Sequence, residues 1–375
     1  MKKIFYWSPF IGKIATIKAV INSATSIKKY EKKDNNVSII NCYGEWDKYR
    51  NILKKNKIVI TTLQKFFKVN VNTQGYFNSR KIFIFSFFFL YFKLKKLLED
   101  NKPDILIIHL LTYIPLLLFL SNNFDTKLYL RISGKPKLGF LRKIFWKFSS
   151  NKIDKVFCPT QETKKILEKM KIFSKQKLIY LPDPVINKKV NLFKKKQLIK
   201  NYNFKDKKYY LSIGRLSKQK NHKFLIEFMK KKDSKLIILG NGELRKNLSD
   251  YINNNNIKNV KLLGFRRNIL DYLKKAKAVI IPSLWEDPGF VMIEAANNIV
   301  PIIVSDCPSG PKEFINKNSN GYLFKSNNYK SLSSCFEKFK TDDTKIIKKK
   351  ILGAFNKSMN YTDLNHYNIL KDYLR

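Results

Sequence analysis

The chain has 375 residues, about twice the usual size of one domain, so two domains of similar length are expected. Hydrophobic residues make up 44% and aromatic residues 14%, which excludes an intrinsically disordered protein. The formal net charge of +47 comes mainly from lysine and favours anionic partners such as lipid, phosphate-bearing substrates or nucleic acid. Codon drift in an AT-rich genome would also produce this excess of lysine and asparagine. No zinc-finger spacing, RNA-recognition signature or basic zipper is found, so no nucleic acid partner is expected.

Cysteine spacing and the amino terminus bear on the compartment. Cys42, Cys158, Cys307 and Cys335 lie far apart and form no CxxC pair, so neither a zinc site nor a disulfide framework is expected. The first ten residues, "MKKIFYWSPF", read as a strand rather than a secretion signal, and no apolar run reaches transmembrane length. The expected compartment is the cytoplasm.

Short apolar runs in the first half predict strands that begin at Lys3, Val37, Lys57, Asp104, Lys127, Lys155 and Lys177. Longer helical stretches separate them, which is typical of parallel sheets with crossover helices. The stretch from Pro182 to Lys196 contains two prolines and then many lysines, so it is the expected interdomain linker.

One segment of the first half, Lys81 to Glu99, has an aromatic run followed by lysines. It is too short to cross a bilayer, and two interpretations remain open. The segment lies in a lipid interface with its rings buried and its ammonium groups at the headgroups, or it is a helix packed on the sheet. A helix that is only partly covered by the protein would be compatible with both interpretations.

The second half repeats the alternation, with runs that begin at Tyr209, Lys235, Val260, Ala278 and Pro301. Each run ends in Gly, Ser or Asp, and ligands of open α/β sheets bind outside the carboxyl ends of strands. We therefore predict an α/β protein of two doubly wound Rossmann-like domains facing across a cleft, with room for two substrates. The expected domains are 1–185 and 186–355, and 356–375 form a C-terminal helix that can return to the first domain.

Charged residues follow two of these second-half strands. Arg215 and Lys220 flank a loop after the strand from Tyr209, and Glu286 follows the strand from Ala278. Glu294 comes eight positions later, on the expected helix. A glycine at 289 lets the backbone N–H groups of Gly289, Phe290 and Val291 approach a phosphate at the positive end of that helix. The alternative is that both acids only complement the helix dipole.

Several second-half motifs together resemble glycosyltransferase family 4: "SIGRLSKQKN", "LIILGNGELRKNL", "WEDPGFVMIEAA" and "SDCPSGPKEFINKNSNGYLF". The resemblance covers Tyr209 to Phe324, whereas the first half is similar only in the order of its strands and helices. It implies the GT-B fold and a retaining enzyme that takes a sugar from a nucleoside diphosphate sugar. By this resemblance, Arg215 and Lys220 neutralise the diphosphate, Glu286 binds hydroxyls of the donor sugar, and Glu294 binds the ribose diol.

Other positions have a structural interpretation beside the functional one. Gly240 and Gly242 form either a turn near the nucleotide base or a purely structural turn. In a second motif, Asp306, Ser309 and Gly310 either contact the sugar or phosphate or only shape a turn. Gly12 follows the first strand, where the family keeps a glycine loop near the transferred sugar. His109 ends a strand and either bonds a sugar hydroxyl or is structural. Where some family members place a further histidine, this chain has Arg131 and Ser133. The expected acceptor or sugar contacts are thus His109, Arg131 and Ser309.

The expected function is retaining transfer of a hexosyl or N-acetylhexosaminyl group from a UDP-linked sugar, with Arg215, Lys220 and Glu286 as catalytic residues and no metal cofactor. The expected acceptor is a glycan or lipid-linked glycan in lipopolysaccharide, O-antigen or other surface polysaccharide synthesis. A basic, aromatic first half favours a peripheral protein on the anionic inner face of the cytoplasmic membrane. The alternatives are a non-catalytic membrane-associated scaffold and a sugar-nucleotide epimerase of the same architecture.

Overall fold

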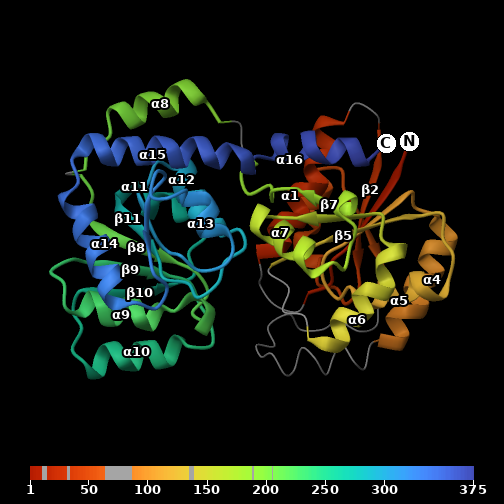
Figure 1. The fold of residues 1–375 in the computed structure, drawn as a ribbon, viewed down its shortest axis with the longest axis horizontal. Helices are drawn as coiled ribbons and strands as arrows, with labels where there is room; N and C mark the ends of the chain where they lie inside the picture. The colour runs from red at the N-terminus through yellow and green to blue at the C-terminus, as the bar shows by residue number, and fades with distance from the viewer. Residues whose placement is uncertain (11–14, 32–33, 64–86, 135–138, 188–189, 205) are drawn as a thin grey trace. The chain divides into compact units, whose positions relative to one another are not determined.

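Two compact units make up the chain (Figure 1). The computed structural model describes all residues except 11–14, 32–33, 64–86, 135–138, 188–189 and 205. Unit 1 consists of Met1–Asn187 and Asp363–Arg375, and unit 2 of Lys188–Thr362. Each unit contains one parallel sheet with crossover helices, which confirms the predicted α/β fold of two Rossmann-like sheets.

The sheet of unit 1 has the strand order β3-β2-β1-β4-β5-β6-β7, with every neighbouring pair parallel. The order reverses between β1 and β4, the place where doubly wound sheets bind ligands. All the strands expected in the first half are present: β1 (Lys3–Trp7), β2 (Asn36–Asn41), β3 (Val59–Thr62), β4 (Ile105–Ile108), β5 (Lys127–Arg131), β6 (Lys155–Cys158) and β7 (Leu178–Tyr180).

Helices of unit 1 cover both faces of this sheet, because alternate strand residues point to opposite sides. Phe5 and Trp7 of β1 belong to one core cluster, and Ile4 and Tyr6 belong to another. The helices are α1 (Ala15–Tyr30), α2 (Arg50–Lys55), α4 (Phe87–Asn101), α5 (Tyr113–Ser121), α6 (Phe140–Ser149), α7 (Gln161–Met170) and α16 (Asp363–Leu370).

Helix α4 lies in the aromatic segment for which two interpretations were open; the part from Lys81 to Ser86 lies outside the described residues. One side of α4 buries Leu90, Leu94, Leu97 and Leu98, so the expectation of a packed helix is confirmed for that side. The other side leaves Phe88 and Phe92 exposed. Within the described part of the chain, no helix combines the length and the apolar character that a membrane span requires.

The sheet of unit 2 has the parallel order β10-β9-β8-β11-β12-β13. Five of its strands were expected: β8 (Tyr209–Ile213), β9 (Leu236–Leu239), β10 (Val260–Gly264), β11 (Ala276–Ile281) and β12 (Ile302–Ser305). The edge strand β13 (Tyr322–Phe324) has only three residues and was not expected. The helices are α8 (Leu192–Lys200), α9 (His222–Lys230), α10 (Arg245–Asn254), α11 (Ile269–Lys275), α12 (Phe290–Asn297), α13 (Gly310–Ile315), α14 (Tyr329–Thr341) and α15 (Thr344–Ser358).

The expected linker from Pro182 to Lys196 was too long. Helix α8 begins at Leu192, inside that stretch. Its start is fixed by Asn191, whose side-chain oxygen accepts a 2.9 Å hydrogen bond from the backbone N–H of Lys194. A helix with lysine on most of its surface is stable here because it is capped and buries Ile199 in the core of unit 2.

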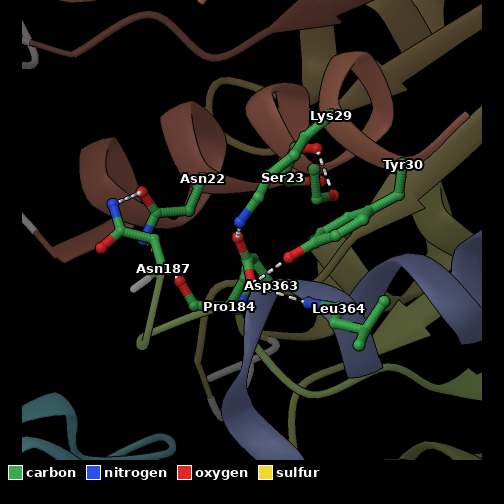
Figure 2. Close-up of polar contacts among 9 residues, drawn as sticks. Asn22, Ser23, Lys29, Tyr30, Pro184, Asn187, Asp363 and Leu364 are labelled. Atoms are coloured by element: carbon green, nitrogen blue, oxygen red, sulfur yellow. Dashed lines mark hydrogen bonds and ion pairs between the residues drawn. The ribbon is translucent and has the colours of Figure 1, made fainter. Parts of the chain in front are cut away.

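Helix α1 fastens both segments of unit 1 that connect to unit 2 (Figure 2). The Asn22 side-chain amide donates a 2.6 Å hydrogen bond to the carbonyl oxygen of Pro184. On the returning segment, the Asp363 carboxylate accepts from Lys29 Nζ at 2.8 Å and from the Tyr30 hydroxyl at 3.1 Å. These contacts fix the start of α16 to α1.

Candidate functional site

Most of the expected residues of unit 2 lie in loops at the carboxyl ends of four strands, and Phe290, Val291 and Glu294 lie on helix α12 (Phe290–Asn297). Strands β8 and β11 are neighbours in the sheet, with β9 beyond β8 and β12 beyond β11. The strand order reverses between β8 and β11, so the loops after these two strands diverge to opposite sides of the sheet and leave space between them. This switch point is where the candidate site of unit 2 is built.

The loop after β8 carries the two expected cations. Lys220 Nζ forms an ion pair with the Glu286 carboxylate, and the Lys220 side chain is 19% exposed. Its hydrocarbon stem passes over Gly214, where a Cβ atom would lie 3.1 Å from Lys220 Cδ. Arg215 is exposed in the same loop. Both cations are therefore in the loop that the sequence predicted, and their contact with a diphosphate stays a prediction.

Glu286 is buried, with 7% of its surface exposed, and its carboxylate is fixed by two side chains. Oε1 accepts a 2.7 Å hydrogen bond from Ser283 Oγ and also takes the ion pair with Lys220. Among the residues that the structure describes, none donates a hydrogen bond to Oε2. The arrangement can therefore present one carboxylate oxygen to a donor such as a sugar hydroxyl.

The backbone of Glu286 joins the loop after β11 to the loop after β12. Glu286 N–H donates to the Pro308 carbonyl at 2.7 Å, and Ser309 N–H donates to the Glu286 carbonyl at 2.6 Å. Gly310 is required for this approach, since a Cβ there would lie 2.1 Å from the Pro288 carbonyl oxygen. Ser309 is buried, and its hydroxyl also donates to the Glu286 carbonyl at 3.5 Å. This geometry gives Ser309 a structural role, and its contact with a sugar stays a prediction.

Helix α12 begins directly after the Glu286 loop. Its N-cap is Gly289, in the left-handed region at φ 95°, and no side chain caps the first turn. The N–H groups of Phe290 and Val291 belong to the first turn of the helix, whose donors have no partner within the helix and lie at the positive end of its dipole. Glu294 is half-buried in this helix. The predicted order of carboxylate, amide donors and second carboxylate is thus present on one loop and helix.

Gly240 and Gly242 allow two loops to pack backbone against backbone. A Cβ at Gly240, where φ is 142°, would lie 1.9 Å from the Gly214 carbonyl oxygen, and a Cβ at Gly242 would lie 2.3 Å from the Leu216 carbonyl oxygen. Both glycines therefore have a structural reason, namely to bring the loop after β9 against the loop that carries Arg215. Contact with the nucleotide base stays a prediction.

His109 and Arg131, the residues of unit 1 expected to contact acceptor or sugar, lie at the ends of β4 and β5. Arg131 donates a 2.6 Å hydrogen bond to the Leu181 carbonyl and forms a buried ion pair with Asp183. His109 is buried, its Nε2 has no partner among the described residues, and burial holds its pKa well below the usual range. The two side chains line a small cavity of about 10 Å³ in unit 1, where Arg131 is already engaged with Asp183 and Leu181. Their contact with an acceptor stays a prediction, and Gly12 lies outside the described residues.

Two residues of the site escaped the sequence analysis. Ser283 holds Glu286, and its only signal was that the run "AVIIPS" ends in a serine. Gln219 joins the two central loops: its side chain donates to the Trp285 carbonyl at 2.9 Å, and its own carbonyl accepts from Leu284 N–H at 2.8 Å. No pattern in the sequence around Gln219 indicates that it pairs with the loop after β11. In the part of the chain that the structure describes, no group of three or more His, Cys, Asp or Glu residues is placed to hold a metal ion.

Comparison with known proteins finds similarity to glycosyltransferases. Residues 194–356, within unit 2, match the family model of glycosyl transferases group 1. The chain is 34% identical over 248 residues to an uncharacterized glycosyltransferase of Methanocaldococcus jannaschii, a match that covers 60% of this chain and 61% of the relative. It is 29% identical over 241 residues to the Escherichia coli UDP-Gal:alpha-D-GlcNAc-diphosphoundecaprenol alpha-1,3-galactosyltransferase, covering 60% and 59%. The chain thus spans about three fifths of these curated relatives.

Solved structures establish the fold. TarM superposes with a TM-score of 0.75 at 16% identity, covering 100% of this chain and 98% of TarM. The apo lipopolysaccharide outer core galactosyltransferase WaaB gives 0.70 at 15% identity, and Anabaena HepE in complex with UDP and glucose gives 0.72 at 14%; each covers 100% of this chain and 99% of the other. The fold is that of GT-B glycosyltransferases.

Proposed function

We propose that this protein is a retaining glycosyltransferase of family 4 that moves a hexosyl or N-acetylhexosaminyl group from a UDP-linked sugar to a glycan or lipid-linked glycan. One observation carries the proposal. A buried carboxylate, Glu286, is oriented by Ser283 and Lys220 at the switch point of the sheet, directly before the uncapped start of α12. A glycosyl donor needs cations and amides for its diphosphate and an acceptor oxygen for its hydroxyls, and these groups lie together here.

The proposed roles follow from the chemistry of each group. Arg215, Lys220 and the first amides of α12 stabilise the negative charge that grows on the departing diphosphate. Oε2 of Glu286 accepts a hydrogen bond from a hydroxyl of the transferred sugar, and Glu294 binds the ribose diol. The bond from the anomeric carbon to the diphosphate breaks, and the acceptor oxygen bonds to the same face of that carbon. The leaving phosphate oxygen takes the acceptor proton. Because the new bond forms on the face that the diphosphate leaves, the configuration is retained, and the proposed scheme uses no metal.

The acceptor and location are proposed from the relatives. The Escherichia coli relative acts on a diphosphoundecaprenol-linked sugar, and a Campylobacter jejuni relative, 25% identical over 300 residues, acts on a PP-undecaprenol-linked glycan. We propose that this chain likewise extends a lipid-linked glycan for lipopolysaccharide, O-antigen or another surface polysaccharide, at the cytoplasmic face of the membrane.

The test combines transfer with donor binding. Arg215→Ala should lower kcat about 100-fold, because one preorganised donor to the leaving group is worth about 3 kcal/mol. Glu286→Ala should abolish measurable transfer because the sugar is no longer placed. Arg50→Ala, an exposed arginine of unit 1 that pairs with Asp47, is the matched control and should keep full activity. Full transfer by both site variants would overturn the assignment.

Donor identity is tested by thermal shift with UDP, GDP and dTDP sugars, because a ligand of the native state raises its apparent stability. We expect stabilisation by a UDP sugar and not by the others. Chelation with EDTA should leave the transfer rate unchanged. Conversion of the donor to an epimer in the absence of acceptor would show the epimerase alternative to be correct.

A further inference from the structure

Neighbouring helices of unit 1 expose large apolar side chains that the core does not use. Helix α5 contacts both α4 and α6, and the three lie side by side in Figure 1. Their outward side chains form what we call the aromatic face: Phe88 and Phe92 on α4, Leu120 on α5, and Phe140, Leu141 and Phe148 on α6. Monomeric soluble proteins rarely expose contiguous apolar patches of this kind unless they bind something.

Helical spacing places the exposed rings of α4 on one side of that helix and those of α6 on one side of α6, away from the core. Phe88 and Phe92 are four residues apart and are 70% and 63% exposed. Phe140 and Phe148 are eight residues apart, on one side of α6, and are 78% and 72% exposed. The opposite sides of both helices are buried in the core of unit 1, through Leu94 of α4 and Trp146 of α6. The exposed rings are therefore not part of that core.

The aromatic face also contains a hollow between α4 and α5, with a volume of about 380 Å³. Its walls include Phe88, Tyr91 and Phe92 from α4 and Leu117 and Leu120 from α5. A 2.6 Å hydrogen bond between the Tyr91 and Ser121 hydroxyls satisfies the polar atoms at its edge. An apolar hollow whose polar groups are paired with each other is suited to a hydrocarbon chain.

Charge around the aromatic face selects an anionic partner. Helices α4, α5 and α6 carry six cations, Lys93, Lys95, Lys96, Arg142, Lys143 and Lys147, against two acids, Glu99 and Asp100. Lys93 Nζ lies 5.6 Å from the centre of the Phe89 ring, so an ammonium group borders the exposed rings. A second copy of this chain would bring cations against cations across a symmetric contact, whereas anionic lipid headgroups complement them.

We propose that the aromatic face docks on an anionic lipid bilayer, with Phe88, Phe92, Phe140 and Phe148 in the interface and the lysines and Arg142 at the headgroups. Aromatic rings and basic side chains are the residues that bind interfaces in this way. The inference deepens the proposed function, because it assigns the membrane contact to a defined surface, and it rests on that function for the reason why a membrane would be met. The binding itself involves no sugar transfer.

The experiment is co-sedimentation of the full chain with vesicles of phosphatidylglycerol and phosphatidylcholine in equal parts, and with pure phosphatidylcholine. The wild type should bind the anionic vesicles at least about tenfold more tightly, and salt should weaken this binding. Phe88→Ser/Phe92→Ser and Phe140→Ser/Phe148→Ser should each lose at least about tenfold. Exposed rings are replaced, so urea unfolding should show both double variants folded.

Helix α8 of unit 2 supplies the matched control. Phe193 is 71% exposed and is followed by Lys194, Lys195 and Lys196, so it has a similar local composition outside the aromatic face. Phe193→Ser should bind vesicles as the wild type does. An equal loss in Phe193→Ser, or wild-type binding by both double variants, overturns the proposal.

Two further outcomes separate this proposal from its competitors. A dimer that forms without lipid and is lost in both double variants would overturn it and identify an interface between copies. If the protein binds UDP-sugar but not vesicles, the membrane proposal is overturned and the proposed function is not. If it binds vesicles but not UDP-sugar, the proposed function is overturned and the membrane proposal is not.

Discussion

The carboxylate of Glu286 is held in one orientation by its neighbours. The ammonium of Lys220 and the hydroxyl of Ser283 meet at the same carboxylate oxygen, and the backbone of Glu286 is paired on both sides with the loop after β12. A buried carboxylate without such partners would be destabilising. The direction of its carboxylate is therefore fixed before any ligand arrives, as preorganised catalysis requires.

Gly240→Ala tests how closely the loops that carry these residues pack. The new Cβ would lie 1.9 Å from the Gly214 carbonyl oxygen at a φ of 142°, so the loop after β8 must shift. We expect the free energy of unfolding of unit 2 to fall by at least about 2 kcal/mol, measured by urea unfolding. Gly139→Ala is the control, because its Cβ meets nothing within 4 Å, and it should change stability by less than about 1 kcal/mol. Equal losses in the two variants would contradict the packing argument.

The sequence predicted that the candidate site residues follow strands of unit 2, but not how these residues are paired; their roles stay predictions. Arg215, Lys220 and Glu286 follow strands, and the ends of strands can be read from apolar runs. The ion pair of Lys220 with Glu286 joins positions 66 apart, and no local pattern encodes such a distance. Arg131 shows the same limit, because its partner Asp183 became visible only in the folded unit.

Polar contacts hold helix α16 in place. Asp363, at its start, accepts from Lys29 and Tyr30 of α1, and His366 Nε2 lies 2.8 Å from Ser23 Oγ of the same helix. The other ring nitrogen of His366 lies 2.7 Å from the Pro182 carbonyl oxygen. Helix α16 is short, and an eight-residue helix is not stable in isolation, so these contacts with α1 and the segment before Asn187 hold it.

Asp363→Ala should loosen α16. The change leaves Lys29 and Tyr30 without their acceptor, which should lower the free energy of unfolding of unit 1 by about 1–3 kcal/mol in urea. Hydrogen exchange of the α16 amides should become faster. The control Asp372→Ala removes an exposed carboxylate a few residues further along the same terminal segment. It should leave the free energy of unfolding within about 0.5 kcal/mol of the wild type and the exchange of the α16 amides unchanged. Unchanged exchange in Asp363→Ala would mean that apolar packing alone holds the helix.

Strands and helices could be predicted from the sequence where their own residues show a clear apolar pattern. Strand β4 is a continuous apolar run, "ILII", and was expected without knowledge of its neighbours. Strand β13 has three residues, too few to show a periodicity, and among the described strands it pairs with β12 alone. Helix α8 was taken as linker because its lysines conceal a periodicity that becomes apparent only once Ile199 is placed in the core.

Across the whole molecule, the three histidines share one property: each is buried and neutral. Burial lowers the pKa of His222 and of His366 to about 3, and that of His109 well below its usual range. Unfolded histidines bind protons below about pH 6.5, whereas these cannot until the pH is far lower. The unfolded chain therefore gains protons on acidification, and each histidine lowers the free energy of unfolding by up to about 1.4 kcal/mol per pH unit.

One buried acid opposes this trend. Burial raises the pKa of Glu45 to about 7, although the backbone N–H groups of Tyr43 and Cys42 donate to its carboxylate. Between about pH 7 and pH 4.5 the folded chain binds a proton there that the unfolded chain does not. Protonation of Glu45 therefore raises stability as the pH falls, and it offsets about one of the three histidines. Burial raises the pKa of Asp183 as well, in the same sense.

Glu45→Gln should consequently make the protein more sensitive to acid. The substitution removes the offsetting proton but keeps an oxygen that can accept one of the backbone N–H groups. From about pH 6.5 to pH 4.5, the free energy of unfolding should fall more steeply than in the wild type, by up to about 1.4 kcal/mol per pH unit. Urea unfolding at a series of pH values measures this slope. Glu99→Gln changes an exposed glutamate of the same unit and should keep the wild-type slope. If Glu45→Gln also kept that slope, the carboxylate would be ionised in the folded protein throughout the range, and the acid sensitivity would have to be assigned to the histidines without an offset.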